Sequence, residues 1–130
     1  MITTGGVFFA ELMGTIEVWD SIFTSNSANQ GGGAFYVLTY STITIYNCSV
    51  SLSSTFGKGG AVQVQAYATF ISHQSVFTRN EAAIGGALHA EFNAHLYLYD
   101  TKISSNVARY LGVSTPEMFS DTFLTRRAYL

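Results

Sequence analysis

Glycine pairs recur along this 130-residue chain at an almost constant interval, and this repeat is the strongest constraint on its fold. Successive pairs lie 27, 27 and 26 residues apart, and a column of Asn or Ser residues keeps the same spacing. Such a period indicates structural units that stack on their neighbours. The pairs are Gly5/Gly6, Gly32/Gly33, Gly59/Gly60 and Gly85/Gly86, and the second column is Asn26, Ser53, Asn80 and Asn106.

Apolar and polar residues alternate after each glycine pair, which is typical of a strand with one buried face. A second alternating run and a third short apolar segment follow within each unit, and no unit carries a helical stripe. The sequence therefore predicts an all-β fold, a right-handed single-stranded parallel β-helix (pectin-lyase-like solenoid) of about four coils over residues 1–112. A β-sandwich is the alternative. The first run comprises Phe8, Ala10 and Leu12, then Phe35 and Val37, then Val62 and Val64, then Leu88, Ala90 and Phe92.

The repeated small and amide residues have expected structural roles in such a stack. Gly32, Gly33, Gly59, Gly60, Gly85 and Gly86 are expected at sharp corners that need a positive φ or a close backbone approach. Asn26, Asn80 and Asn106 are expected at a turn where Asn tolerates left-handed geometry, and where stacked amides can hydrogen-bond between coils.

Low charge excludes several classes of partner. Charged residues make up 11% of the chain, against roughly 25% in average soluble proteins. A net charge of −2 argues against nucleic acid as a partner. No apolar run approaches the roughly 18 residues that a membrane-spanning helix needs. The composition therefore favours a folded domain that neither binds nucleic acid nor spans a membrane.

Two short motifs carry a resemblance to a known family. Gly-Gly-Ala before an apolar residue occurs at residues 32–35, 59–62 and 85–88, and Phe-x-x-Asn occurs at 23–26 and 77–80. Together they resemble the repeats of the chlamydial polymorphic outer-membrane proteins. The resemblance implies a β-helix passenger segment of a surface-displayed adhesin, and hence a cell-surface or extracellular location. The sequence itself leaves the compartment unknown.

Groups that could perform catalysis do not converge in the predicted register. Glu11 and Glu91 share a column but lie three coils apart, about 14 Å, beyond the roughly 5–9.5 Å of a glycosidase pair. The three histidines have no cysteine near them in register, and Cys48 has no acid–base partner there. We therefore expect a non-enzymatic module with no catalytic, cofactor or metal site. A carbohydrate-binding or polysaccharide-degrading β-helix protein is the alternative.

An outward aromatic column is the candidate interaction surface. By alternation, Trp19, Tyr46, His73 and Tyr99 lie on the outer face of the second strand, and Phe9 and Tyr36 lie on the outer face of the first. Three interpretations remain open: ring stacking that stabilises the sheet, burial under a protein partner, and a platform for sugars.

The two ends of the stack differ. Residues 113–130 form a predicted tail, in which Ser114 to Glu117 suggest a helix start and a short capping helix over roughly 116–128. At the other end, Phe8, Leu12, Ile16 and Phe23 are expected to lie on an open edge. The expected partners are other protein chains or further coils of a longer chain, docked at the N-terminal end, with carbohydrate as a possible ligand.

Overall fold

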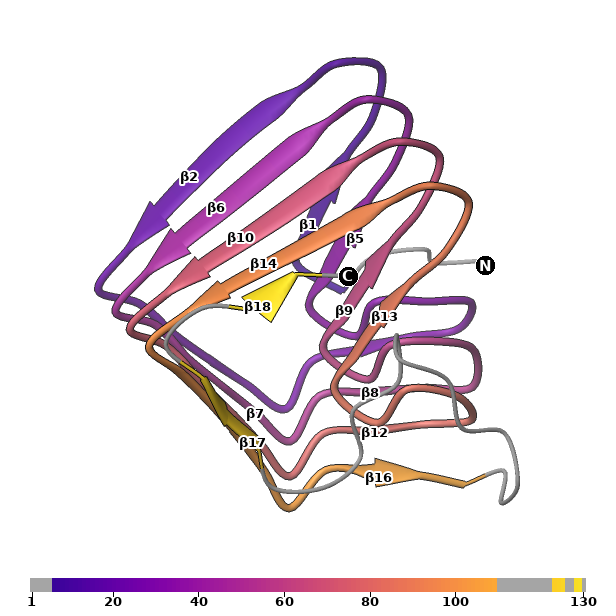
Figure 1. Cartoon of the computed structure of the whole chain (residues 1–130). Helices are drawn as coiled ribbons and strands as arrows, with labels where there is room; N and C mark the ends of the chain where they lie inside the picture. Colours follow the sequence, from indigo (N-terminus) through magenta and orange to yellow (C-terminus); the bar gives the residue numbers. More distant parts are fainter. Residues whose placement is uncertain (1–5, 110–122, 126–127, 130) are drawn as a thin grey trace.

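Parallel strands stack in four coils in the computed structural model, which describes residues 6–109, 123–125 and 128–129 (Figure 1). We number the coils by the second glycine of each pair: coil one covers residues 6–32, coil two 33–59, coil three 60–85 and coil four 86–109. Each coil contributes one strand to each of four sheets, so a fourth, two-residue strand adds to the three that the sequence predicts. The predicted parallel β-solenoid is thereby confirmed.

The four sheets run along the stack in coil order. The first contains β1 (Phe8–Ala10), β5 (Phe35–Val37), β9 (Val62–Val64) and β13 (Leu88–Ala90). The second contains β2 (Thr15–Trp19), β6 (Thr42–Tyr46), β10 (Thr69–His73) and β14 (His95–Tyr99). The third contains β3 (Ile22–Thr24), β7 (Ser49–Ser51), β11 (Val76–Thr78) and β15 (Thr101–Ser104). The fourth contains β4 (Ser27–Ala28), β8 (Ser54–Thr55), β12 (Glu81–Ala82) and β16 (Val107–Ala108).

The core lies inside the coils and is built from columns of like residues. Phe8 pairs with Phe35, and Phe35 with Val62, in the register that the repeat predicts. Ser72 interrupts an apolar column and is fully buried. Its burial is tolerated because its hydroxyl forms a 2.9 Å hydrogen bond with the Thr101 hydroxyl. Burial of these columns is the main source of stability, since each apolar side chain removed from water contributes about 1.5–3 kcal/mol.

The sequence predicts a positive φ or a close backbone approach at each glycine corner, and the two glycines of a pair divide these conditions between them. The first, Gly32, Gly59 or Gly85, has a positive φ of 56°, 70° or 65°. The second lies against the backbone of the next coil: a Cβ on Gly33 would sit 2.2 Å from the carbonyl oxygen of Gly60. Only glycine meets both conditions at low cost.

The residues of the Asn column do not occupy the left-handed position that the sequence predicts, and side-chain amide bonds between coils are present at Asn80 and Asn106. The left-handed residue is the one before each Asn, for example Ser25 and Arg79. Asn80 and Asn106 are buried, and the Oδ1 of Asn106 accepts a 2.8 Å hydrogen bond from the backbone N–H of Asn80. Polar side chains of this kind satisfy buried backbone groups between coils.

The alternation of the first strand ends earlier than predicted. Leu12 and Phe92 were expected to continue the inward face, but they are 73% and 68% exposed. Strands β1 and β13 stop at Ala10 and Ala90, and the chain then turns through residues with positive φ, which include Leu12 at 57° and Phe92 at 55°. The bend rotates these side chains away from the core.

The tail covers strand edges of coil four, but not with the predicted helix. The backbone of β17 (Phe123–Thr125) pairs antiparallel with β15, and that of β18 (Ala128–Tyr129) pairs antiparallel with β14. The helix expected over 116–128 is therefore wrong at these two strands, and its remaining residues lie outside the described part of the chain. Paired edges satisfy backbone groups that a helix packed on the coil would leave open.

Candidate interaction surface

The predicted aromatic column forms a continuous ladder of stacked rings on the second sheet. Ring centroids lie 3.8 Å apart for Trp19 and Tyr46, 4.8 Å for Tyr46 and His73, and 4.8 Å for His73 and Tyr99. The angles between successive ring planes are 13°, 5° and 9°. Since Tyr46 and His73 are covered by rings on both faces, the ladder presents ring edges to a partner. This geometry favours stacking within the sheet over a sugar platform, which needs a free ring face.

The outward aromatic residues of the first sheet differ in accessibility. Phe9 is 44% exposed, whereas Tyr36 is only 9% exposed, and their ring centroids lie 5.5 Å apart with a 49° tilt. Burial raises the pKa of the Tyr36 hydroxyl, and the negative charge of Glu91 raises it further. Of these two residues, only Phe9 offers substantial surface to a partner.

A polar network that the sequence did not predict covers the outer side of β9 and β13. Glu91 accepts a 2.6 Å hydrogen bond from Lys58 Nζ and a 3.1 Å bond from Gln63 Nε2. His89 Nε2 lies 3.4 Å from the same carboxylate. Burial alone would raise the pKa of Glu91, but the hydrogen bond and charge of Lys58, with a contribution from His89, lower it overall. A lowered pKa suits a permanent ion pair better than a general acid.

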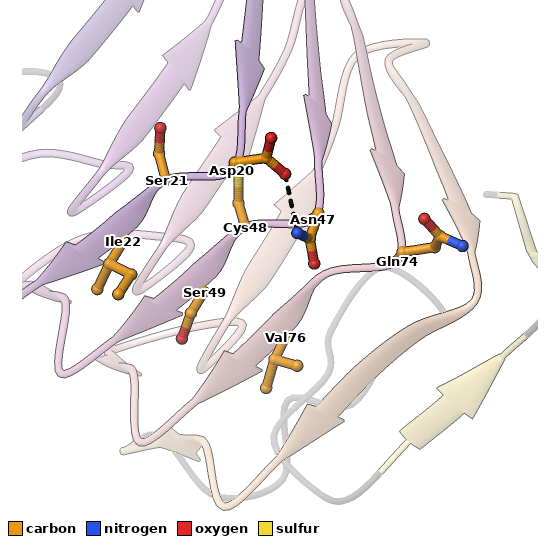
Figure 2. Close-up of a pocket in the computed structure, with 8 residues that line it drawn as sticks. All are labelled: Asp20, Ser21, Ile22, Asn47, Cys48, Ser49, Gln74 and Val76. Carbon is orange, nitrogen blue, oxygen red and sulfur yellow. Dashed lines mark hydrogen bonds between the residues drawn. The ribbon is translucent and has the colours of Figure 1, made fainter.

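A shallow groove of about 320 Å³ follows the corner between the second and third sheets (Figure 2). The corner residues Asp20, Asn47 and Gln74 have positive φ angles of 49°, 51° and 49°. Asn47 Nδ2 donates a 2.8 Å hydrogen bond to Asp20 Oδ1, so these two polar side chains of the groove are already bonded to each other. The groove is lined by Asp20, Ser21, Ile22, Asn47, Cys48, Ser49, Gln74 and Val76.

Cys48 belongs to the corner structure of this groove. Its side chain is 3% exposed, and Sγ lies 3.3 Å from the carbonyl oxygen of Tyr46. In the next coils, the hydroxyls of Ser75 and Thr101 donate to the carbonyl oxygens of His73 and Tyr99 in the same way. The thiol therefore replaces a hydroxyl in a repeated corner bond. Within residues 6–109, no three His, Cys, Asp or Glu side chains are grouped as a metal site requires.

One corner of the coils carries unlike residues, as several outward columns of the strands also do. Asn29, Phe56, Ala83 and Arg109 follow the fourth-sheet strands at successive intervals of 27, 27 and 26 residues, one in each coil. Repeated residue types do not reveal this column, because its four residues differ in kind. The same 27- and 26-residue spacing would have revealed it as a departure from the repeat.

Comparisons with known proteins add one match. The family model described as the Chlamydia polymorphic membrane protein repeat matches residues 20–38, which include the first Phe-x-x-Asn motif and the Gly-Gly-Ala-Phe motif. Comparison with curated proteins and with solved structures gave no match for the chain. Among the residues that the structure describes, no helix is long and apolar enough to cross a membrane. The chain thus carries a repeat similar to those of the polymorphic membrane proteins, and its β-solenoid is consistent with a structural module of a surface protein.

Proposed function

We propose that this chain is a non-catalytic structural and interaction module, the β-helix segment of a larger surface or multi-chain assembly. The resemblance to polymorphic membrane protein repeats supports an adhesin-like role at the cell surface. The interactions described above hold chemically active side chains in structural bonds: Glu91 is paired with Lys58, and Cys48 is buried in a corner. These features support a binding role over a catalytic one.

The unequal burial of equivalent core residues carries the proposal. Phe35, Ile43, Ile45 and Val50 of coil two are 0% exposed, whereas their partners in coil one are only half-buried. Trp19, at the coil-one end of the aromatic ladder, is 57% exposed. A further parallel coil docked here would extend both the core columns and the aromatic ladder. Such a coil could belong to another chain or to a longer version of this chain. The half-buried residues are Phe8, Ile16, Val18 and Phe23.

Adding a coil tests the proposal directly. A copy of residues 33–59 placed immediately before Gly6 preserves the 27-residue register, because Gly6 then follows the copy as Gly60 follows Gly59. We expect a higher melting temperature and slower hydrogen exchange of the coil-one amides, because four half-buried side chains become enclosed. The matched control carries Asp in the copied coil at the positions of Phe35 and Ile45. Equal stability of the two fusions, with unchanged coil-one exchange, would show that this end does not accept a coil.

A further inference from the structure

A second hollow, of about 260 Å³, lies outside the groove and the ladder described above. We propose that it binds one residue of a neutral saccharide. The volume is just below the range of about 300–1,000 Å³ for small-molecule sites, so it suits a single sugar ring better than a larger ligand. The hollow is lined by Ser27, Ala28, Asn29, Ser54, Thr55, Phe56 and Arg109.

The irregular outward column creates this hollow. Phe56 belongs to coil two and Arg109 to coil four, and the corresponding corner of coil three carries the small, buried Ala83. In the aromatic ladder, large side chains of neighbouring coils such as Tyr46 and His73 stack and leave no gap between them. A large side chain in place of Ala83 would fill the hollow in the same way. Arg109 instead reaches across the gap, with its Cζ 5.9 Å from the centroid of the Phe56 ring.

Phe56 keeps most of its apolar surface exposed despite its contact with Arg109. Its side chain is 76% exposed, and its ring is not part of a stacked ladder like that of Tyr46 and His73. An aromatic ring is negatively polarised over its face, so it attracts the positively polarised C–H groups on one side of a sugar ring. Exposing this ring has a cost in water that a stacked ligand would recover.

Arg109 lines the hollow beside that ring, and Glu81, which is not a lining residue, is bonded to Arg109 and pairs with the lining residue Ser54. The Nε of Arg109 donates to a carboxylate oxygen of Glu81, and the two side chains are 41% and 47% exposed. This bond engages one of the five guanidinium donors and leaves further acceptor capacity on the carboxylate. The pair can therefore both donate to and accept from adjacent hydroxyl groups, while its charges cancel. A neutral polyhydroxylated ligand fits this balance better than an anion, which Glu81 would repel.

The neighbouring strands of the fourth sheet extend the same chemistry, since Ser54 pairs with Glu81 across β8 and β12. Ser27 and Ser54 pair across β4 and β8, which places two hydroxyls side by side at one strand spacing, about 4.8 Å. A serine hydroxyl both donates and accepts hydrogen bonds, as sugar hydroxyls do. An apolar ring on one side and hydroxyl-binding groups around it together form the arrangement that a sugar requires.

Chemical-shift mapping of the whole chain with the methyl glycosides of glucose, galactose and N-acetylglucosamine tests the proposal. We expect at least one of them to shift the Ser27, Ser54 and Phe56 resonances with millimolar affinity, and Phe56→Ala and Arg109→Gln to weaken this binding at least fivefold. Phe92→Ala is the matched control, since Phe92 is similarly exposed at a turn away from the hollow. Because Phe56, Arg109 and Phe92 are exposed, substituting them should leave the rest of the amide spectrum unchanged.

Three outcomes would contradict the proposal. One is the absence of shifts at these residues with all three glycosides. Another is a shift that persists in Phe56→Ala and Arg109→Gln. The third is stronger binding of glucuronate than of methyl glucoside, which would replace the neutral ligand by an anionic one. The site does not depend on docking at coil one, so none of these results changes the outcome of the added-coil experiment.

Discussion

Asn80 binds the backbone of Ser53 in the coil before it: its side-chain Oδ1 accepts a 2.9 Å hydrogen bond from the Ser53 N–H. Its Nδ2 donates to the carbonyl oxygen of Val50 at 3.1 Å. Both bonds are buried, so one amide satisfies two backbone groups that water cannot reach. This relationship gives the Phe-x-x-Asn motif a physical role as a bond between coils.

Asn80→Ala is expected to lower the free energy of unfolding by about 2 kcal/mol, because it leaves buried polar groups without their partners. Urea denaturation monitored by circular dichroism measures this change. Thr78→Ala is the control, since Thr78 is half-buried on the outer side of the same coil. If both variants unfold at the same urea concentration, the ladder bond contributes nothing.

Ser53→Asn is expected to raise the free energy of unfolding by about 1 kcal/mol. Ser53 is fully buried, and its hydroxyl has no hydrogen-bond partner within the described residues. An Asn here would continue the ladder formed by Asn80 and Asn106, with its amide bonded to coil one as theirs are to the coils before them. Thermal melting measures the effect, and a lower melting temperature would mean that the site cannot hold the larger amide.

Val64→Asp and Ile45→Asp are each expected to abolish the cooperative unfolding transition. Both side chains are 0% exposed, and an unpaired buried carboxylate costs several kcal/mol, a large fraction of a domain stability of about 5–15 kcal/mol. Gln65→Lys is the control, because this half-buried outward residue lies beside the network of Glu91. Native-like melting of either Asp variant would place these residues outside the core.

Cys48→Ser is expected to stay within about 1 kcal/mol of the parent chain, because a hydroxyl would repeat the corner bond that Ser75 makes. Cys48→Leu should instead cost about 1–3 kcal/mol, since the larger side chain overpacks a buried corner. Calorimetry compares the two variants. A Ser variant that is less stable than the Leu variant would show that the thiol has a role which a hydroxyl cannot take.

Glu91→Gln is expected to reduce the loss of stability in acid. Because the folded-state pKa of Glu91 lies below its ordinary value, its ionised form stabilises the fold above the unfolded pKa of about 4.3. That contribution is lost as the pH falls through the folded pKa. The difference in unfolding free energy between the parent and Glu91→Gln should therefore shrink between about pH 5 and pH 3. Glu17→Gln, at an exposed position outside the Glu91 network, is the matched control for the loss of one carboxylate.

The position of Gln63 shows what alternation does not predict about accessibility. Alternation predicts Gln63 on the outer face of β9, where a substitution by Lys would be expected to be tolerated. The residue does point outward, but it is only 5% exposed, because it is bonded to Glu91 and lies against Gly31. A Cβ on Gly31 would lie 1.6 Å from Gln63 Oε1. A lysine at this position would lose the hydrogen bond to Glu91 and the close packing against Gly31.

The sequence by itself determined the repeat, the register and the inward columns other than the one of Leu12 and Phe92, because stacked coils place residues 26 or 27 apart in direct contact. It also indicated the two roles of the glycine pair and the ladder of Trp19, Tyr46, His73 and Tyr99. Only the tertiary structure decided how side chains from different columns meet, such as Lys58 with Glu91 and Arg109 with Phe56. These contacts depend on the direction in which each corner points its side chains and on which neighbouring residues are small. The repeat period in the sequence contains neither kind of information.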